Sequence, residues 1–343
     1  MTILPRCLLS LALVTAACSG SGADEDSARG HVSGQDQGDP SQSSDPSASA
    51  PSPGASSTAG DYAKMKYPIV LAHGLLGFRR LGGVVDYFFG IPGDLRSSGA
   101  QVFVTQVSAV NSSEARGEQL LAQIERITAE TGAGKVNLVA HSQGGIDSRY
   151  VMNVRPDLIA SLTTVASPHL GGGPADDLLT YVNDNAFNEL VVIVFGNAFG
   201  AIEDLLTGTT EPQDVIGALR TLSAAGAAAF NKKYPAGLPT TKCGTGAAMN
   251  GDIPLFSWAG STIKTNSHDL SDTLLGLTGA GFTEENDGLV QRCDGHFGTV
   301  LRDNYVMNHL DEINQMFSLT AASETDPREV YRVQANRLKL AGL

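Results

Sequence analysis

The chain has 343 residues, of which 42% are hydrophobic and 17% are charged, so it carries enough apolar material for one sizeable core. Its formal net charge is -13 and its isoelectric point is near 4.9. A surface this acidic repels the phosphates of nucleic acids rather than collecting them, and this excludes nucleic acid as an expected partner.

The first residues have the pattern of a secretory signal. A positive charge at Arg6 precedes an apolar run from Cys7 to Val14, which is too short to cross a bilayer as a helix. Small residues then lead to Cys18, as in a bacterial lipobox, in which the cysteine is lipidated and becomes the new N-terminus. We therefore predict a lipoprotein-like signal peptide over residues 1–17 and an exported protein. It is either anchored through Cys18 at the outer membrane or cell surface, or cleaved and secreted.

The next segment, residues 18–60, is rich in Ser, Gly, Pro, Ala and Asp, and Val32 is its only sizeable aliphatic residue. Such a segment cannot bury enough apolar surface to offset the entropy of ordering it. We predict a disordered tether over residues 18–60 and a single folded domain over residues 61–343.

Apolar runs that contain β-branched residues alternate with apolar residues at helical spacing in the first part of this domain. The predicted elements are strands at Tyr67–Ala72, Val102–Val107, Lys135–Ala140 and Leu162–Ala166, with helices at Ser113–Thr128 and Gly144–Val154. Strands that alternate with helices predict a mostly parallel sheet covered on both faces. Ligands of such sheets bind beyond the carboxyl ends of the strands.

Ser142 has the sequence surroundings of a nucleophile elbow, in which a strand turns sharply into a helix. The residues two positions away must be small, because the tight turn brings them against the neighbouring strand and helix. Ala140 and Gly144 meet this requirement, although glycine is usual at both places. Chance occurrence of the pattern is the alternative, and its position directly after a predicted strand argues against chance.

A serine nucleophile needs a base to take its proton and an acid to orient the base, in the order Ser, acid, His for this type of fold. Four histidines follow the nucleophile segment: His169, His268, His296 and His309. Three carboxylates compete for the acid: Asp287, Asp294 and Asp303. Asp287 is favoured because its Asp-Gly turn can present a carboxylate, and the pattern ranks His309 only modestly above His296.

Two cysteines lie outside the targeting segment, Cys243 and Cys293. In an oxidising compartment they are candidates for a disulfide, which would stabilise the chain by about 4 kcal/mol in the chain-entropy model. Two unrelated buried thiols are the alternative.

Several separate motifs, in order along the chain, resemble the true lipases of Pseudomonas and Burkholderia type, which form bacterial lipase family I. They are the segments 67–78, 94–123, 136–145, 287–293 and 302–317. The resemblance covers nearly all of residues 62–343. It implies the α/β-hydrolase fold, with a mostly parallel central sheet, helices on both faces and a helical lid. It also implies folding with the help of a dedicated membrane foldase.

The resemblance resolves the choice of catalytic residues that spacing left open. It implies Ser142 as nucleophile, His309 as base and Asp287 as acid. It further implies an oxyanion hole formed by the backbone N–H groups of Leu75 and Gln143, of which the second belongs to the residue after the nucleophile.

Members of the family bind one structural calcium ion. The matching positions are the carboxylates of Asp269 and Asp311 and the backbone carbonyls of Gln315 and Leu319, and hard oxygen ligands of this kind suit calcium. Asp311 lies two residues from His309, so we expect the ion to fix the histidine loop and to stabilise the fold rather than to take part in the chemistry. The cysteine pair Cys243 and Cys293 also matches the disulfide of the family.

The segment 183–207 carries a broad apolar face and corresponds to the lid helix of the family. An ordinary core helix is the alternative.

The sequence thus predicts an exported triacylglycerol lipase that acts on water-insoluble esters at an interface. A polyester depolymerase with the same triad is the first rival hypothesis, and a non-catalytic binding module anchored at the surface is the second.

Overall fold

The computed structural model describes residues 60–182 and 211–343. The predicted signal peptide with Cys18, the predicted tether except Gly60, and the predicted lid segment 183–207 lie outside the described residues. Within the described residues, no helix combines the length and the apolar content that a bilayer crossing requires.

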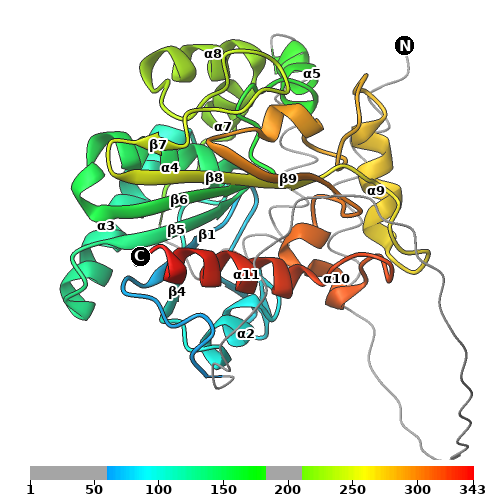
Figure 1. Cartoon of the computed structure of the whole chain (residues 1–343). Helices are drawn as coiled ribbons and strands as arrows, with labels where there is room; N and C mark the ends of the chain where they lie inside the picture. The colour runs from blue at the N-terminus through cyan, green and yellow to red at the C-terminus, as the bar shows by residue number, and fades with distance from the viewer. Residues whose placement is uncertain (1–59, 183–210) are drawn as a thin grey trace, which may run out of the picture.

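A seven-stranded sheet forms the centre of the molecule, with the order β4-β1-β5-β6-β8-β7 and with β9 paired to β8 (Figure 1). Every neighbouring pair is parallel except β7 with β8. The strands are β1 (Ile69–Ala72), β4 (Val102–Val104), β5 (Val136–His141), β6 (Ile159–Val165), β7 (Met249–Asn250), β8 (Ile253–Gly260) and β9 (Thr299–Tyr305). The predicted mostly parallel sheet is therefore confirmed.

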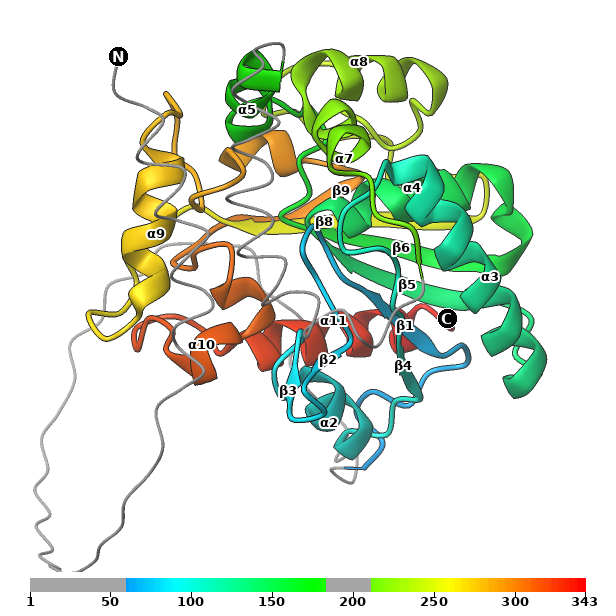
Figure 2. The same ribbon diagram turned by 180° about the vertical axis from the view of Figure 1, so that it is seen from behind.

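Helices cover both faces of the sheet (Figure 1 and Figure 2). The α-helices are α2 (Ile91–Ser97), α3 (Ser113–Thr131), α4 (Gln143–Val154), α5 (Pro174–Val182), α7 (Val215–Leu222), α8 (Ala224–Lys233), α9 (Leu270–Gly279), α10 (Gln315–Ser318) and α11 (Pro327–Leu340). Short 3-10 turns are η2 (Pro156–Leu158), η3 (Arg292–Gly295) and η4 (Asp311–Ile313), and a small hairpin is formed by β2 (Arg80–Leu81) and β3 (Val85–Asp86).

Two apolar clusters lie on the two faces because successive side chains of a strand point to opposite sides. On β1, Ile69 and Leu71 pack with residues of α2 and α11, whereas Val70 and Ala72 pack with residues of α3 and α4. The strands are thus buried on both faces, which explains why they appear in the sequence as continuous apolar runs rather than as an alternating pattern.

Strand β4 is shorter than the predicted strand Val102–Val107. The backbone N–H of Gln106 donates to the side chain of Gln123 at 3.0 Å, and that of Val107 donates to Nε2 of His73 at 3.1 Å. These amides bond to side chains instead of a neighbouring strand, so regular pairing ends at Val104.

Candidate active site

Ser142 follows β5 directly and precedes α4, at the carboxyl end of the parallel sheet. Its backbone angles are φ 55° and ψ -131°, a combination that costs free energy for a residue with a side chain. The turn is held by hydrogen bonds on both sides of the serine: its N–H donates to the carbonyl of Val165 at 2.8 Å, and its carbonyl accepts from the N–H of Gly145 at 3.0 Å. The predicted strand, sharp turn and helix are all present.

Two glycines permit the close packing around this turn. A Cβ atom on Gly144 would lie 2.6 Å from the carbonyl oxygen of His73, and one on Gly74 would lie 2.6 Å from Cβ of Ser142. Both distances are far below van der Waals contact. The small residue expected at position 144 is therefore required by the backbone that follows β1. Gly74 leaves room for the side chain of Ser142 next to the loop after β1.

Asp287 and His309 form a buried pair. Oδ2 of Asp287 accepts from Nδ1 of His309 at 2.8 Å, while Oδ1 accepts from the backbone N–H groups of Leu289 and Val290 at 2.8 and 2.7 Å. The carboxylate is thus fixed by its own Asp-Gly turn. The ring of His309 lies next to the elbow, because its centroid is 4.5 Å from that of His141, the residue before Ser142.

The rival histidines have other surroundings. His296 lies between Oδ2 of Asp303, at 2.9 Å from its Nε2, and the carbonyl of Gly244, at 2.7 Å from its Nδ1. His169 is buried with its Nε2 at 3.1 Å from Oγ1 of Thr164, and His268 is exposed. The remaining rival acid, Asp294, accepts from Gln291 at 2.9 Å.

Arg116 of α3 organises the loop after β1. Its fully buried guanidinium donates to the carbonyls of His73 and Gly74 at 2.8 and 3.1 Å, and its Nε donates to Oδ2 of Asp147 on α4 at 2.7 Å. The carbonyl of Gly74 and the N–H of Leu75 belong to one planar trans peptide, so they point in opposite directions. Because Arg116 holds the carbonyl, it also fixes the direction of the Leu75 N–H.

A buried polar chain runs behind the elbow, through Gly74, Tyr87, His141, Glu312 and Gly260. The hydroxyl of Tyr87 accepts from the N–H of Gly74 at 3.1 Å and lies 2.8 Å from Nδ1 of His141. Nε2 of His141 is 3.4 Å from Oε2 of Glu312, whose other oxygen accepts from the N–H of Gly260. Burial lowers the pKa of His141 well below its usual value and raises that of Glu312 well above its own.

His141, His309 and Glu312 also bring three metal-ligand atoms within 4.8 Å of one another. The set has two imidazoles and one carboxylate, whereas calcium prefers oxygen ligands alone. The contacts of these residues belong to the polar chain and to the Asp287 pair, so we treat the set as part of the candidate active site.

The residues expected to bind calcium include two buried carboxylates with unpartnered oxygens. Among the described residues, no hydrogen-bond donor reaches Oδ2 of Asp269 or Oδ1 of Asp311. The pKa of Asp311 is raised to about 7, first by burial and further by the negative charges of Asp269 and Asp272. Two buried carboxylates, each with an unpartnered oxygen, form a donor set that suits a hard divalent cation, and this fits the predicted ion.

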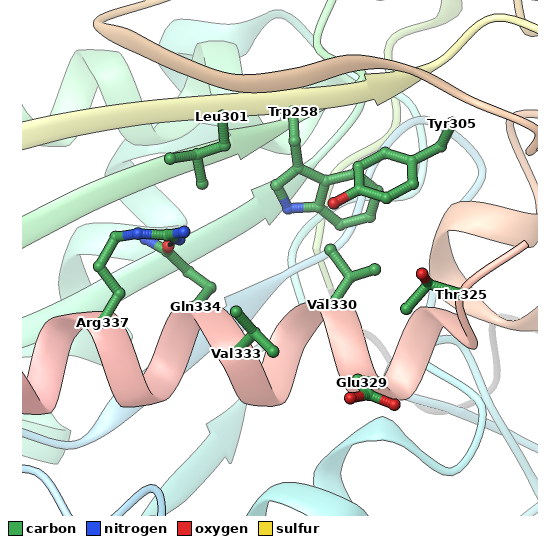
Figure 3. Close-up of a pocket in the computed structure, with 9 residues that line it drawn as sticks. All are labelled: Trp258, Leu301, Tyr305, Thr325, Glu329, Val330, Val333, Gln334 and Arg337. Carbon is green, nitrogen blue, oxygen red and sulfur yellow. Dashed lines mark hydrogen bonds between the residues drawn. The ribbon is translucent and has the colours of Figure 1, made fainter. Parts of the chain in front are cut away.

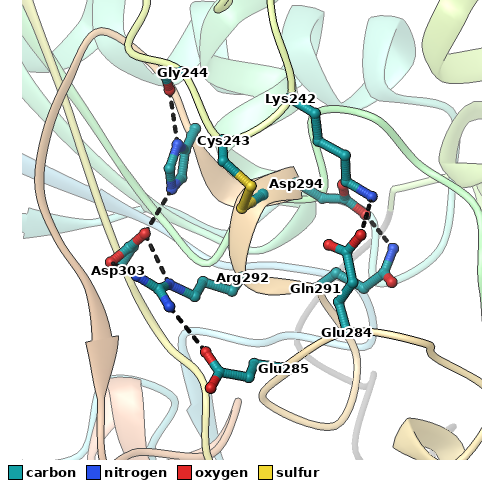
Figure 4. The surroundings of a disulfide bond; sticks show 11 residues. Lys242, Cys243, Gly244, Glu284, Glu285, Gln291, Arg292, Asp294 and Asp303 are labelled. Carbon is teal, nitrogen blue, oxygen red and sulfur yellow. Dashed lines mark hydrogen bonds and ion pairs between the residues drawn. A yellow bond between two sulfur atoms is a disulfide. The ribbon is translucent and has the colours of Figure 1, made fainter.

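The disulfide between Cys243 and Cys293 lies among residues of the segment 284–294, which contains the Asp287 turn (Figure 4). The surrounding contacts are ionic: Lys242 pairs with Glu284, and Arg292 pairs with Glu285 and Asp303. Cys293 is six positions from Asp287, so the crosslink ties the end of the acid-bearing turn to the distant Lys242–Gly244 loop.

Comparison with known proteins decides the family. A family model described as alpha/beta hydrolase fold matches residues 67–258. A triacylglycerol lipase of Vibrio cholerae is 50% identical over 283 residues, which cover 82% of this chain and 90% of that protein. The chain belongs to the bacterial triacylglycerol lipases of the α/β-hydrolase family.

Further similarities agree with this family of ester hydrolases. A triacylglycerol lipase of Pseudomonas fragi is 41% identical over 293 residues, covering 82% of this chain and 99% of that protein. The crystal structure of Staphylococcus hyicus lipase matches with a TM-score of 0.57 over 81% of this chain and 97% of that one, at 17% identity, which bears on the fold alone. The predicted fold class and the predicted lipase family are confirmed.

Sequence reasoning did not find the supporting residues of this lipase site. Arg116 and Asp147 lie on helices that the pattern predicted, yet nothing in the spacing of α3 and α4 indicates that their charges meet. Glu312 follows His309 by three positions, which was a usable signal. No sequence signal pointed to Tyr87, because its contact with His141 depends on the path of the chain after β1.

Proposed function

We propose that the chain hydrolyses triacylglycerols and related water-insoluble esters through a triad of Ser142, His309 and Asp287. One observation carries the assignment. The buried Asp287–His309 pair has its imidazole against His141, directly beside the strained turn that holds Ser142. A nucleophile, a base and an orienting acid are thereby contributed from segments far apart in the sequence.

The proposed reaction is a two-step acyl transfer. Oγ of Ser142 attacks the ester carbonyl while Nε2 of His309 takes its proton, and Asp287 stabilises the imidazolium that results. The tetrahedral intermediate collapses, the alcohol leaves with the proton from His309, and the acyl group stays on Ser142. Water then attacks the acyl-enzyme, again with His309 as base, and the fatty acid is released.

The backbone N–H groups of Leu75 and Gln143 are proposed as the oxyanion donors. Gln143 begins α4, where the first amides of a helix have no acceptor within the helix. The direction of the Leu75 amide follows from the carbonyl contacts of Arg116. Donors of this kind each lower the barrier by about 3 to 4 kcal/mol.

One calcium ion is proposed to bind the carboxylates of Asp269 and Asp311 and the backbone carbonyls of Gln315 and Leu319. The unpartnered buried oxygens of the two aspartates support this set. When bound, the ion supplies positive charge that offsets the repulsion among these carboxylates. Asp311 holds the backbone N–H of Asn308 at 3.1 Å, so fixing Asp311 also fixes the segment next to His309.

We further propose export, a lipid tether at Cys18, a lid over residues 183–207 and assistance by a foldase. They rest on the sequence patterns and on similarity to the bacterial lipases, because these segments lie outside the described residues. Radiolabelled palmitate incorporated by wild type and not by Cys18→Ser would support the tether.

Hydrolysis of emulsified tributyrin tests the proposal, and the activity of Ser142→Ala is compared with that of the control variant Ser97→Ala. Ser97 is exposed on α2 and its hydroxyl only bonds to the nearby carbonyl of Asp94. We expect Ser142→Ala to lose turnover while its melting temperature is kept, and Ser97→Ala to behave as wild type. Esterase activity retained in Ser142→Ala would refute the triad, and faster release of acid from polyester film than from emulsified oil would favour the depolymerase.

A further inference from the structure

A cavity separate from the candidate active site lies between α11 and the strands β8 and β9 (Figure 3). Its volume is about 300 Å³, at the lower end of the range for sites that hold small molecules. Trp258 of β8 forms one wall, and Val330 and Val333 of α11 face it from the other side.

Two hydrogen-bond donors at this cavity have unused capacity. The indole Nε1 of Trp258 is buried and has no acceptor among the described residues. In Figure 3 this nitrogen lies on the side of the ring that faces Gln334. Arg337, at the rim, is exposed, and among the described residues its guanidinium donates only to Oε1 of Gln334. The amide of Gln334 is itself used, because it donates to Oγ1 of Thr163 at 2.9 Å.

Arg337 brings a positive charge to one end of the cavity, whereas Glu329 at the other end pairs with Arg332 at 3.6 Å. Arg337 and Glu329 are separated by eight positions on α11, which corresponds to about 12 Å along the helix. Between them Val333 and Leu301 provide an apolar surface. A ligand that suits this arrangement has one negative group at Arg337 and an apolar body.

We propose that this cavity binds an aliphatic monocarboxylate of short to medium chain length. The carboxylate lies at Arg337 and the chain lies along Val333 and Leu301, against the ring of Trp258. Free fatty acid is the product of ester hydrolysis, so the biological source of the ligand rests on the proposed function, whereas binding itself does not.

Intrinsic fluorescence gives a direct readout, because Trp258 is the only tryptophan of the chain. The full chain, with its active site first blocked by a phosphonate inhibitor, is titrated with octanoate below its micellar range. We expect a saturable change in emission with a dissociation constant in the millimolar range. Octan-1-ol, which lacks the charge, and suberate, which places a second charge against the apolar lining, should bind more weakly.

The variant Arg337→Gln should weaken octanoate binding about fivefold, equivalent to about 1 kcal/mol. Arg126→Gln changes an exposed arginine of α3, away from this cavity, and should leave binding unchanged. Both variants should keep wild-type melting temperatures and tributyrin activity. A linear response to octanoate, equal binding of octan-1-ol, or an unchanged affinity in Arg337→Gln would overturn the proposal. A failed triad would instead appear as activity in Ser142→Ala, which leaves this titration interpretable.

Discussion

Asp287 and His309 are joined twice, once through their side chains and once through their backbones. Nδ1 of His309 lies 2.8 Å from Oδ2 of Asp287, and the backbone N–H of His309 donates to the carbonyl of Asp287 at 2.9 Å. The backbone hydrogen bond fixes the distance between the two segments independently of the side-chain bond. The acid and the base are therefore positioned together, and Ser142 at the elbow is the third residue of the proposed triad.

Asp287→Asn tests the role of the acid. An amide in place of the carboxylate can present the wrong group to Nδ1 of His309 and cannot stabilise the imidazolium, so kcat should fall on the order of 10²- to 10⁴-fold with KM little changed. Steady-state kinetics with p-nitrophenyl butyrate measures both constants. Asp303→Asn, which removes the acid next to His296, is the matched control and should retain kcat. The reverse ranking of the two variants would move the triad to His296.

Arg116→Lys tests the placement of the oxyanion loop. A single ammonium cannot reach Asp147 and the carbonyls of His73 and Gly74 together, so the Leu75 amide loses its fixed direction. We expect kcat to fall at least about tenfold with KM nearly unchanged, since the lost donor acts in the transition state. A thermal melt shows whether the variant is still folded at the assay temperature, which separates a loss of kcat from unfolding. Asp147→Asn keeps the guanidinium and its carbonyl contacts and should lose less kcat. Equal losses of kcat in the two folded variants would contradict the role of these contacts in directing the Leu75 amide.

Calcium removal should lower stability before it alters the chemistry. With the ion present at about 100 times its dissociation constant, binding contributes about 2.7 kcal/mol, which corresponds to a loss of roughly 5 to 10 °C in melting temperature when a chelator is added. Asp311→Asn should melt at one temperature with or without calcium. Asp252→Asn, an exposed acid, should keep the full response. Identical melts of the wild-type chain in calcium and in chelator would contradict the ion.

His169 gives a pH dependence of known sign. Burial, together with the charge of Arg149, lowers its pKa well below 6.5, so the unfolded chain binds a proton that the folded chain does not. The stability that neutral His169 contributes is therefore present above about pH 6.5 and is lost as the pH falls, by about 1.4 kcal/mol per pH unit. Buried Glu312 and Asp311 have raised pKa values and act in the opposite direction, so the wild-type curve alone is not decisive.

The difference between wild type and His169→Gln isolates this contribution. Denaturant unfolding at pH 7.0, 6.0 and 5.0 should show the stability advantage of the wild type shrinking as the pH falls. His268→Gln, at an exposed position, should show a constant difference from wild type. A constant difference for His169→Gln as well would mean that the histidine titrates normally in the folded chain.

The sequence predicted the fold where local pattern and tertiary structure agree. The strands around Ile69 and Val136 are apolar on both faces because helices cover both faces, and the tight turn at Ser142 requires the small residue at position 144. Pattern failed where side chains replace strand pairing, as at Val107, whose amide bonds to His73. Such contacts depend on three-dimensional proximity and produce no periodic pattern in the sequence.

For the candidate site, the residues alone ranked His309 only modestly above His296 as the base. Neither an Asp-Gly turn nor a histidine late in the chain tells how far apart the side chains lie in the fold. Resemblance to the lipase family chose His309, and the contacts of His296 with Asp303 and Gly244 now give a physical reason why it has another role. The buried partner Tyr87 could not be ranked from the sequence, because a buried hydroxyl is indistinguishable there from an exposed one.

Covalent labelling tests the central claim most directly. The folded protein is treated with a fluorophosphonate, which reacts with activated serines, and the modified peptide is identified by mass spectrometry after digestion. We expect one phosphonylated residue, Ser142, with labelling that parallels the loss of tributyrin activity and is absent in Ser142→Ala. Complete inactivation with Ser142 unmodified, or labelling of another serine in step with the activity loss, would contradict it.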